Sequence, residues 1–506
     1  MELKLNTAVV DCYEKVFSQT VRQEESQTAV VPETLPDIGS ILCASGTALI
    51  RGKDVEEGRI RLEANIPVRI SYCPDEGEGV RGLEVNVPLY LSLEDAGIPE
   101  KGVCVADISL AAVEAKLLNP RKISVRAEAV FSVDCYAEGE LEFEGAPEGA
   151  PAEGVNVLQK RLTVTPVRAV TEKTFVLVDE FNLPAALSGA DTVLNQQTGV
   201  AVEDVQATGS KLIVKGSVKS CVFCADADGT AGAVEFSTGF SQIIDLGRTP
   251  EDEVFAAVSI LLSGAHYDLD GEGRTGSAEL HLVAQVVARE RAEVSCLADA
   301  YSNRRAVELA CDEREVRRVK TEFCLRASLR EAIPTECTVA GVVQSCAVPG
   351  TPRTDGDKVS VPVSVCLLYR DADGCLRAEK RKFEAAFSYE LQEGEALFPV
   401  GACVQEMYVS PSEDGAEVRM TLELRVFLTE TETVKCVTGV SWDETAEADA
   451  DAQTRPTLVI LRACAKDDLW MLAKQNCSTV EAIIEANGID PGDGTWEKLI
   501  LIPKTV

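Results

Sequence analysis

Histidine, the residue type that most often carries acid–base catalysis, is scarce in this chain of 506 residues. Only His266 and His281 occur, and His281 alternates with Leu280 and Leu282 as a partly exposed strand residue would. The chain has no nucleophile elbow, HExxH helix, phosphate-binding loop or dinucleotide fingerprint. The sequence therefore predicts a protein that is not an enzyme and needs no cofactor, with an enzyme of unrecognised chemistry as the weaker alternative.

Cysteine is plentiful, but its spacing argues against a metal site. The 18 cysteines are scattered singly, and only Cys221 and Cys224 are closely spaced. A zinc site needs two such pairs or added histidines, and residues three apart in a strand point to opposite faces. Buried thiols that act as small apolar side chains are the favoured interpretation, zinc is the alternative, and a reducing compartment is expected.

Two turns rich in aspartate and glycine, at 226–229 and 371–374, superficially resemble calcium-binding loops. An EF-hand loop lies between helices and ends on a bidentate glutamate at its twelfth position, whereas the flanks here are strand-like. Aspartate and glycine also suit tight hairpin turns on their own. We therefore expect hairpin turns without metal, with calcium binding as the alternative.

The net charge of −34 limits the partners of the protein. It disfavours nucleic acid, anionic membrane surfaces and anionic wall polymers as electrostatic partners. No apolar run approaches the ~20 residues that span a bilayer, and the first six residues lack the features of a signal peptide. We expect a cytoplasmic protein without membrane insertion.

A hairpin of one design recurs three times along the chain. Each copy has a strand of period-two alternation, an aromatic residue, a turn, and a return strand. The outgoing strands are 59–71, 211–222 and 358–368, and the aromatic residues are Tyr72, Phe223 and Tyr369. Long alternating strands at 123–136, 277–289 and 417–429 recur in step. The sequence predicts a mostly β protein of three sandwich- or barrel-like repeat units, at residues 1–140, 155–310 and 311–440.

The stretches between these units are acidic and poor in apolar residues. Residues 137–154 carry six glutamates and no basic residue, and an acidic linker is expected at 441–455. Such composition predicts extended, mobile tethers. Within the units, short helices are expected only at 92–96 and in parts of 191–205.

The last fifty residues read strand, helix, helix, strand, and predict a small α/β domain at 456–506. Apolar runs at 458–461 and 499–502 are typical of strands, and Leu469, Leu472 and Ala473 share one helical face. The spacing from Ser478 to Glu481 is typical of a capping box that opens a second helix. Asn487 and Gly488 form the usual left-handed stop.

This order resembles a LysM module with a βααβ fold. The matching residues are Leu-Trp-Met-Leu-Ala-Lys at 469–474, Asn-Gly-Ile at 487–489 and Leu-Ile-Pro at 501–503. The Gly-Asp-Thr triplet of the family is replaced by Lys466, Asp467 and Asp468, and the glycine before the last strand is missing near 497–498. Those two loops hold N-acetylated glycans in the family, so the resemblance implies the fold more strongly than it implies glycan binding.

Three β-rich units followed by such a module resemble the SPOCS-repeat proteins of spore-forming Firmicutes. The resemblance rests on Leu-Pro-Asp-Ile-Gly-Ser-Ile-Leu at 35–42, on Ile-Ser-Tyr at 70–72, and on domain order. Proteins of this kind are associated with spore coat assembly in the mother cell, where the LysM domain binds a coat-morphogenetic ATPase. The resemblance implies a non-enzymatic scaffold or adaptor at the forespore or spore surface.

The partner-binding surface is expected on the C-terminal domain. Its candidate residues are Lys466, Asp467, Asp468, Trp470, Asn487, Gly488 and Ile489. Trp470 lies off the apolar face of its helix, so partial exposure and a contact with a partner or glycan are weighed equally against core packing. Asp467 and Asp468 are equally well explained as helix caps. The alternative function is binding of peptidoglycan or another N-acetylglucosamine polymer, and self-association through exposed strand edges is a further expectation.

Overall fold

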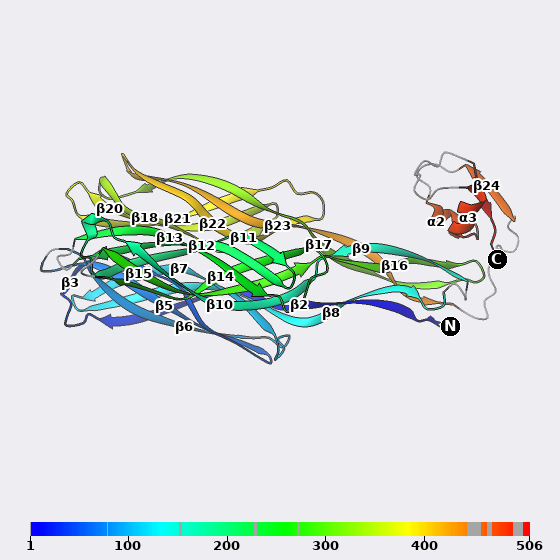
Figure 1. Cartoon of the computed structure of the whole chain (residues 1–506), viewed down its shortest axis with the longest axis horizontal. Coiled ribbons are helices and arrows are strands. Elements are labelled where there is room, and N and C mark those ends of the chain that lie inside the picture. Colours follow the sequence, from blue (N-terminus) through cyan, green and yellow to red (C-terminus); the bar gives the residue numbers. More distant parts are fainter. Residues whose placement is uncertain are drawn as a thin grey trace.

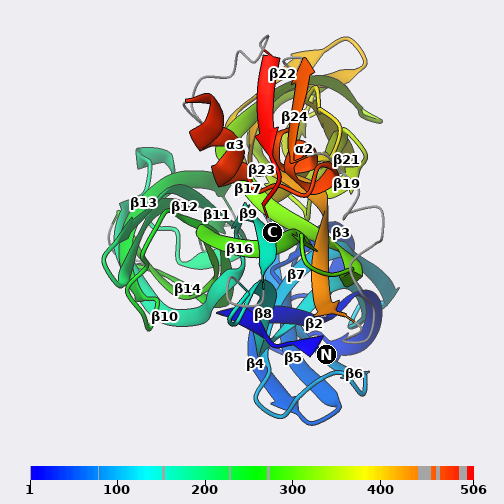
Figure 2. The same cartoon turned by 90° about the vertical axis from the view of Figure 1, so that its right-hand side faces the viewer.

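The computed structural model describes residues 2–77, 79–150, 154–226, 230–270, 274–442, 457–462, 468–488 and 499–505. The chain is mostly β, with 77% strand and 4% helix, as the alternating patterns predict. Figure 1 shows an elongated body of strands that narrows towards one end, with a small helical part beyond it. Viewed along the long axis, the body consists of three lobes around a shared centre (Figure 2).

Each lobe is built from successive strands of one stretch of the chain. The first lobe contains β2 (Leu5–Val30), β3 (Ile38–Gly46), β4 (Leu49–Glu56), β5 (Arg59–Pro74), β6 (Arg81–Glu94), β7 (Val103–Asn119) and β8 (Lys122–Pro147). The second contains β10 (Val167–Asn182), β11 (Thr192–Thr208), β12 (Lys211–Ala225), β13 (Ala231–Asp245), β14 (Val254–Leu269) and β15 (Thr275–Glu290), with a short 3-10 turn at Ala185–Leu187. The third contains β17 (Glu308–Pro334), β18 (Val339–Pro349), β19 (Arg353–Asp355), β20 (Lys358–Asp371), β21 (Leu376–Ser388), β22 (Glu395–Ser412) and β23 (Gly415–Ser441).

The three lobes have the same order of strands. One row of strands in each lobe runs β2–β8–β7, β10–β15–β14 or β17–β23–β22, and the other runs β3–β5–β6, β11–β12–β13 or β18–β20–β21. The first two rows join into one six-stranded sheet, because β10 pairs with β2 where Val167 meets Tyr13. The central strands β5, β12 and β20 form the expected hairpins with the strands that follow them. Each pair of sheets encloses its own apolar core. Every second residue of the central strand points into the core. In β5 these residues are Ile60, Leu62, Ala64, Ile66, Val68 and Ile70.

A bulge in the second sheet of each lobe brings the lobes together. The extra residues are Leu42, Leu194 and Val343, each skipped in the pairing with the central strand. All three side chains belong to one apolar cluster between the lobes, together with Phe223 and Leu368. A bulge re-aims a side chain that would otherwise follow the pleat, and here it supplies the contact between lobes.

The three aromatic residues that the sequence pattern treats as equivalent do not occupy equivalent positions in the structure. Tyr72 and Tyr369 lie in the cores of their own lobes, but Phe223 faces the other lobes. The matching core position in the second lobe belongs to Cys224, one residue later. Alignment by aromatic residue type missed this shift, although Cys224 is in step with the inward-facing Val218 and Val222 of β12 and Phe223 is not.

The narrow end of the body is a stalk made of three two-stranded ribbons. They pair residues 5–14 with 137–147, β9 (Val155–Val164) with β16 (Ala292–Ser302), and residues 308–319 with 429–441. Their shared core contains Phe143, Leu162, Val164, Val294, Cys296, Val316, Val434 and Cys436. At the tip, the N-terminal strand β1 (Glu2–Leu3) pairs with the end of β23.

Three expectations about local structure were wrong. Residues 137–147 are not a mobile tether, since they continue β8 and pair with β2. Their glutamates alternate with buried residues such as Phe143, so an acidic composition concealed a strand pattern. Residues 92–94 and 192–205 are strand rather than helix, because pairing with β5 and β12 outweighs local propensity. The linker expected at 441–455 lies almost wholly outside the described residues.

The stalk predicts a stability test. Replacing Phe143 with alanine removes a buried ring from a core shared by all three ribbons, so the free energy of unfolding should fall by about 3–5 kcal/mol. Chemical denaturation would measure the change. The neighbouring exposed residue offers a matched control, because Glu142→Ala should change stability by less than about 0.5 kcal/mol. Equal small effects of both substitutions would mean that this segment is a tether after all.

Candidate functional site: the C-terminal module and its seat

The described residues after 456 form a compact module of two strands and two helices. β24 (Leu458–Arg462) pairs antiparallel with β25 (Leu499–Pro503), and α2 (Leu469–Gln475) and α3 (Val480–Asn487) lie between them in the chain. The strand–helix–helix–strand order is therefore observed. Ala473, Ile483, Ile500 and Ile502 are buried in its core.

The helix ends follow the expected chemistry with one shift. The Asp468 carboxylate accepts from the backbone N–H of Trp470 and caps α2. Thr479, not Ser478, caps α3, because its hydroxyl accepts from the N–H of Ala482. Ser478 is buried instead and donates to the carbonyl of Pro503, 2.5 Å away. Gly488 ends α3 with a φ of 56°, as the Asn-Gly pair predicts.

The module is seated on the tip of the stalk through β16. Asp299 and Tyr301 alternate along β16 and project from one face of the ribbon, and Asn303 lies in the bend directly after the strand ends at Ser302. A bulge between Leu297 and Asp299 sets the register of this end of β16. The seat is thus a row of three polar side chains on the second lobe's ribbon.

A carboxylate at the centre of the seat holds α2. Asp299 accepts from the indole Nε1–H of Trp470 at 2.8 Å and from the Lys474 ammonium at 2.7 Å. The Tyr301 ring packs edge-on against the Trp470 ring, with centroids 4.8 Å apart. Trp470 and Lys474 are one helical turn apart, which brings both donors to one carboxylate.

The other two seat residues bind the turn before α3 and the chain end. The Tyr301 hydroxyl and the Asn303 amide both donate to the carbonyl of Ser478, at 2.9 and 3.1 Å. Asn303 also donates to the Thr505 hydroxyl at 2.8 Å. Contacts to three separate segments fix the orientation of the module relative to the stalk.

The electrostatics favour an ionised Asp299. Partial burial alone would raise the pKa of this carboxyl, but the bonds from Lys474 and Trp470 and the charge of Lys474 outweigh it and hold the pKa below its ordinary value. Burial raises the pKa of the Tyr301 hydroxyl, with nearby carboxylates adding to the effect. Tyr301 therefore stays a neutral donor at neutral pH.

The structure does not gather the predicted site residues into one open surface. Trp470, for which exposure and core packing were weighed equally, is only 8% exposed, because Tyr301 and Asp299 cover it. The Asn487 amide donates to the carbonyls of Ile483 and Leu501 and accepts from the N–H of Leu501, so it joins α3 to β25. Asp468 and Gly488 are helix caps. Lys466, Asp467 and Ile489 lie outside the described residues.

The seat itself was missed by reasoning from sequence. Asp299 and Trp470 are 171 positions apart, and no motif connects them. The alternation of Asp299, Tyr301 and Asn303 is visible in the sequence, but it is also what any half-exposed strand displays. Only the folded stalk reveals that this face meets the module.

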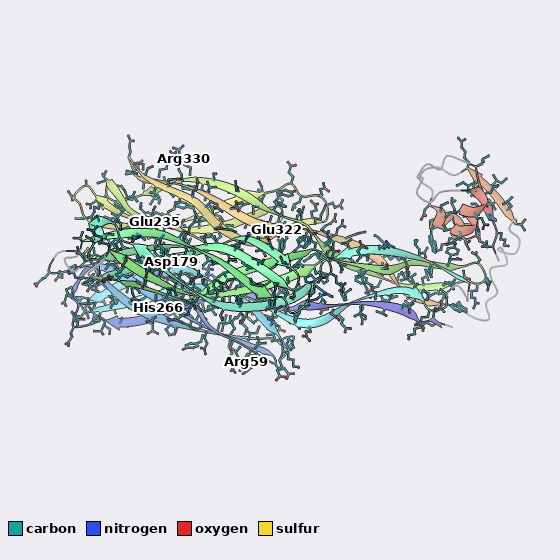
Figure 3. All side chains as sticks on the ribbon, viewed as in Figure 1. Arg59, Asp179, Glu235, His266, Glu322 and Arg330 are labelled. Atoms are coloured by element: carbon teal, nitrogen blue, oxygen red, sulfur yellow. The ribbon has the colours of Figure 1, made fainter. Side chains whose placement is uncertain are left out.

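The other residues that could carry chemistry do not come together in one site. His281 is half-exposed on β15, as predicted, and its Nε2 lies 2.8 Å from the Glu279 carboxylate. The His266 ring meets the His281 ring edge-on, with centroids 6.2 Å apart. Figure 3 shows the labelled residues spread along the body. They lie on β5 (Arg59), β10 (Asp179), β13 (Glu235), β14 (His266) and β17 (Glu322 and Arg330).

Cys221 and Cys224, which are close in the sequence, lie in different environments. The Cys221 thiol accepts from the Gln344 amide between lobes, whereas Cys224 lies in the core of the second lobe. Burial raises the pKa of Cys221 to about 12 and that of Cys224 to about 11, so both remain thiols. Within the described ranges, no three His, Cys, Asp or Glu side chains are placed to hold a metal ion.

The turn at 371–374 uses its carboxylate internally. Asp371 accepts from the backbone N–H groups of Asp373 and Cys375 and from the Arg377 guanidinium. These bonds close the hairpin and leave the carboxylate little capacity for calcium. Residues 227–229 of the other turn lie outside the described residues.

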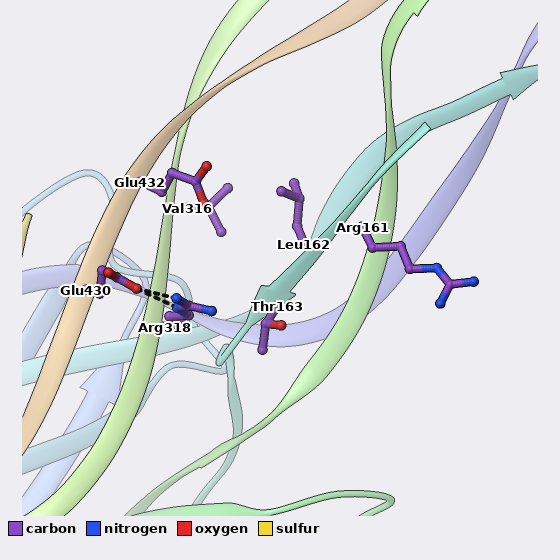
Figure 4. A pocket seen from close by; sticks show the side chains of 7 residues that line it. All are labelled: Arg161, Leu162, Thr163, Val316, Arg318, Glu430 and Glu432. Atoms are coloured by element: carbon purple, nitrogen blue, oxygen red, sulfur yellow. Dashed lines mark hydrogen bonds and ion pairs between the residues drawn. The ribbon is translucent and has the colours of Figure 1, made fainter. Parts of the chain in front are cut away.

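A hollow of about 90 Å³ lies between β9, β17 and β23 in the stalk (Figure 4). Arg318 at its wall is paired with Glu430 at 2.5 Å, and Arg161 points away from it. Ligand pockets usually enclose about 300–1,000 Å³. The hollow is therefore a packing gap between ribbons.

Three comparisons with known proteins found no match for this chain. No protein-family model matches it, and neither the curated proteins nor the solved structures contain a match. In the part of the chain that the structure describes, no helix has the length and apolar character needed to cross a membrane.

The seat predicts the effect of removing its carboxylate. Asp299→Ala leaves the Trp470 indole and the Lys474 ammonium without their acceptor, so docking of the module should weaken by about 2–3 kcal/mol. NMR of the protein labelled with ¹⁵N-tryptophan should show the Trp470 indole N–H move towards its solvent-exposed frequency and exchange faster. Asp312→Ala, at an exposed carboxylate on β17, is the matched control and should leave the resonance unchanged. An unmoved resonance in Asp299→Ala would contradict the seat.

The lowered pKa of Asp299 also predicts how docking depends on pH. A carboxyl whose pKa is lower when docked stabilises the docked state above its ordinary pKa of about 4 and loses that contribution as pH falls through the lowered value. The indole resonance of Trp470 should therefore stay constant from about pH 7 to 5 and shift only at more acidic pH. Asp299→Asn should remove this acid-dependent step, and a step of equal size in that variant would assign it to another group.

Proposed function

We propose that this protein is a non-enzymatic scaffold or adaptor of spore coat or spore envelope assembly. In this proposal the three lobes are repeats of one sandwich- or barrel-like domain, and the module is a LysM-like domain. The body supplies size and rigidity, and the module binds a coat-morphogenetic partner protein at the forespore surface. The shared strand order of the lobes and the strand–helix–helix–strand order of the module support this assignment.

The observation that carries the proposal is the seating of the module. A binding module connected by a mobile linker needs no specific contacts with the rest of its chain, yet here hydrogen bonds from four donor side chains and one ring pair fix it to the stalk tip. The seat lies at the end of the stalk, beyond all three lobes (Figure 1). A module presented in a fixed orientation at one end of a long body suits an adaptor that joins two structures.

The titratable groups described above fit this role better than catalysis. The histidines have no partner arrangement for acid–base chemistry, and the buried thiols have pKa values raised by burial. Asp371 and Asp299, whose pKa values are lowered, are both bonded within the protein. These carboxylates stabilise turns and contacts between segments.

A split binding experiment tests the proposal. The full chain and a chain that ends at Trp442 would each be incubated with purified peptidoglycan and, on beads, with extract of sporulating mother cells. We expect the full chain to retain a coat protein, the shortened chain to lose it, and neither to pellet with peptidoglycan.

Two results would overturn it. Pelleting of the full chain with peptidoglycan, competed by chitin oligomers, would make the module a glycan-binding domain. Equal retention of the coat protein by both chains would move the binding site to the lobes. The unshortened chain with Asp299→Ala is a further control, because it keeps the module but loosens its seat.

A further inference from the structure

The two strands of the module are apolar on both faces. Val459, Leu461, Ile500 and Ile502 face the helices and belong to the module core. The opposite face, which we call the outer face, consists of Leu458, Ile460, Arg462, Leu499, Leu501 and Pro503. The register pairs Leu458 with Pro503, Ile460 with Leu501 and Arg462 with Leu499 across the strands. Five of these six side chains are apolar.

An open face of this composition conflicts with the usual rule for antiparallel sheets. Where one face meets water, strands alternate between apolar and polar residues, whereas continuous apolar runs are typical of sheets covered on both faces. Yet Leu458, Ile460 and Leu499 are 48%, 58% and 70% exposed. The sequence of these strands is that of a sheet covered on both faces, yet among the described residues Leu458, Ile460 and Leu499 remain exposed.

The seat does not cover the outer face. The contacts with the stalk described above are made by Trp470, Lys474, Ser478 and Thr505. The exposed fractions apply with the stalk in place. Figure 1 shows β24 on the side of the module that is turned away from the lobes. The outer face is therefore accessible to another molecule while the module remains seated.

A second copy of the chain is a poor occupant of this face. Each copy carries a net charge of −34, so two copies repel each other. This repulsion favours a different protein over self-association here. Six side chains on two short strands form a small contact for any partner, below the ~800 Å² per partner of a standard interface.

The dimensions of the outer face fit a helix. Five residues of strand are about 17 Å long, and two strands with their side chains are about 10 Å wide. A helix of about three turns has a length of ~16 Å and a diameter of ~10 Å. Apolar residues at positions i, i+3, i+4 and i+7 would place one stripe along the two strands.

The charge of Arg462 would favour one orientation of a helix bound to the outer face. Arg462 is exposed and is the one charged residue of the outer face, at the end where it pairs with Leu499. A carboxylate near one end of the partner helix would meet its guanidinium. We propose that the outer face binds an amphipathic helix of a partner protein that carries a stripe of apolar residues and a carboxylate at the end that meets Arg462. This inference rests on the proposed adaptor function, since it assigns the surface by which the module holds its partner.

Two synthetic peptides test the inference with the full chain. Both are amphipathic helices with leucine at i, i+3, i+4 and i+7, and they differ only in glutamate or lysine flanking the stripe. Fluorescence anisotropy should show at least tenfold tighter binding of the glutamate peptide. Ile460→Asp should weaken that binding at least tenfold, and Arg462→Glu should reverse the preference between the peptides.

Matched variants keep the outcome interpretable. Val178→Asp places the same charge at an equally exposed apolar position on β10 and should leave binding unchanged. Leu499→Ser is a milder change on the outer face and should also weaken binding. It replaces Ile460→Asp as the test if that variant disturbs the module, and the Trp470 indole resonance reports whether the module is intact. Failure of both peptides to bind, or equal binding by all variants, would overturn the inference. Dimers of the full chain that disappear with Ile460→Asp in sedimentation would do the same, by assigning the face to a second copy.

The outcome is separable from that of the proposed function. If the full chain retains a coat protein and Ile460→Asp retains it equally, the adaptor role stands and the outer face is wrong. If the full chain retains no coat protein while the glutamate peptide binds as expected, the face is correct and the adaptor role in coat assembly fails.

Discussion

The packing of three ribbons into one stalk is the constraint on which the rest of the molecule depends. A two-stranded ribbon cannot bury its own apolar face and is marginally stable in water. Phe143 from the first ribbon, Leu162 from the second and Val434 from the third therefore share one core. Because β2, β8, β17 and β23 run unbroken from lobe to stalk, packing in the stalk also fixes how the lobes face one another.

The seat of the module follows from that stalk. Tyr301 and Asp299 project towards the module only because β16 is held as part of the three-ribbon assembly, with Leu297 buried in the core at the tip. The same core contains Leu3 and Val440, so the beginning of the chain and the end of the third lobe both contribute to it. An opening of the ribbons would therefore remove the position of the module and one of the two contacts that hold the lobes together, the other being the apolar cluster around Phe223.

Local patterns in the sequence predicted the hairpins, the long strands and the order of elements in the module, because period-two and helical periodicity report which face is buried. They failed where the deciding contact is distant. The glutamates of 137–147 indicated a tether, but Phe143 in this segment packs against residues of the other two ribbons. The position of Trp470, off the apolar face of its helix, left exposure and packing equally open, and the contacts with Tyr301 and Asp299 decide for packing. Phe223 was aligned with Tyr72 and Tyr369 by residue type alone, although Cys224 is the residue in step with Val218 and Val222 on the inward face of β12.

The two sides of the module have different physical tasks. The helical side is bound to the stalk through Asp299 by charge-assisted bonds, which are directional and set orientation. The sheet side presents apolar surface, which supplies binding free energy without demanding one geometry. A module that swivelled on a linker would lose rotational freedom on binding each partner, whereas a seated one has already lost it during folding. The stalk thus makes the module a preorganised binding surface, and the polar seat and the apolar outer face are two parts of one arrangement.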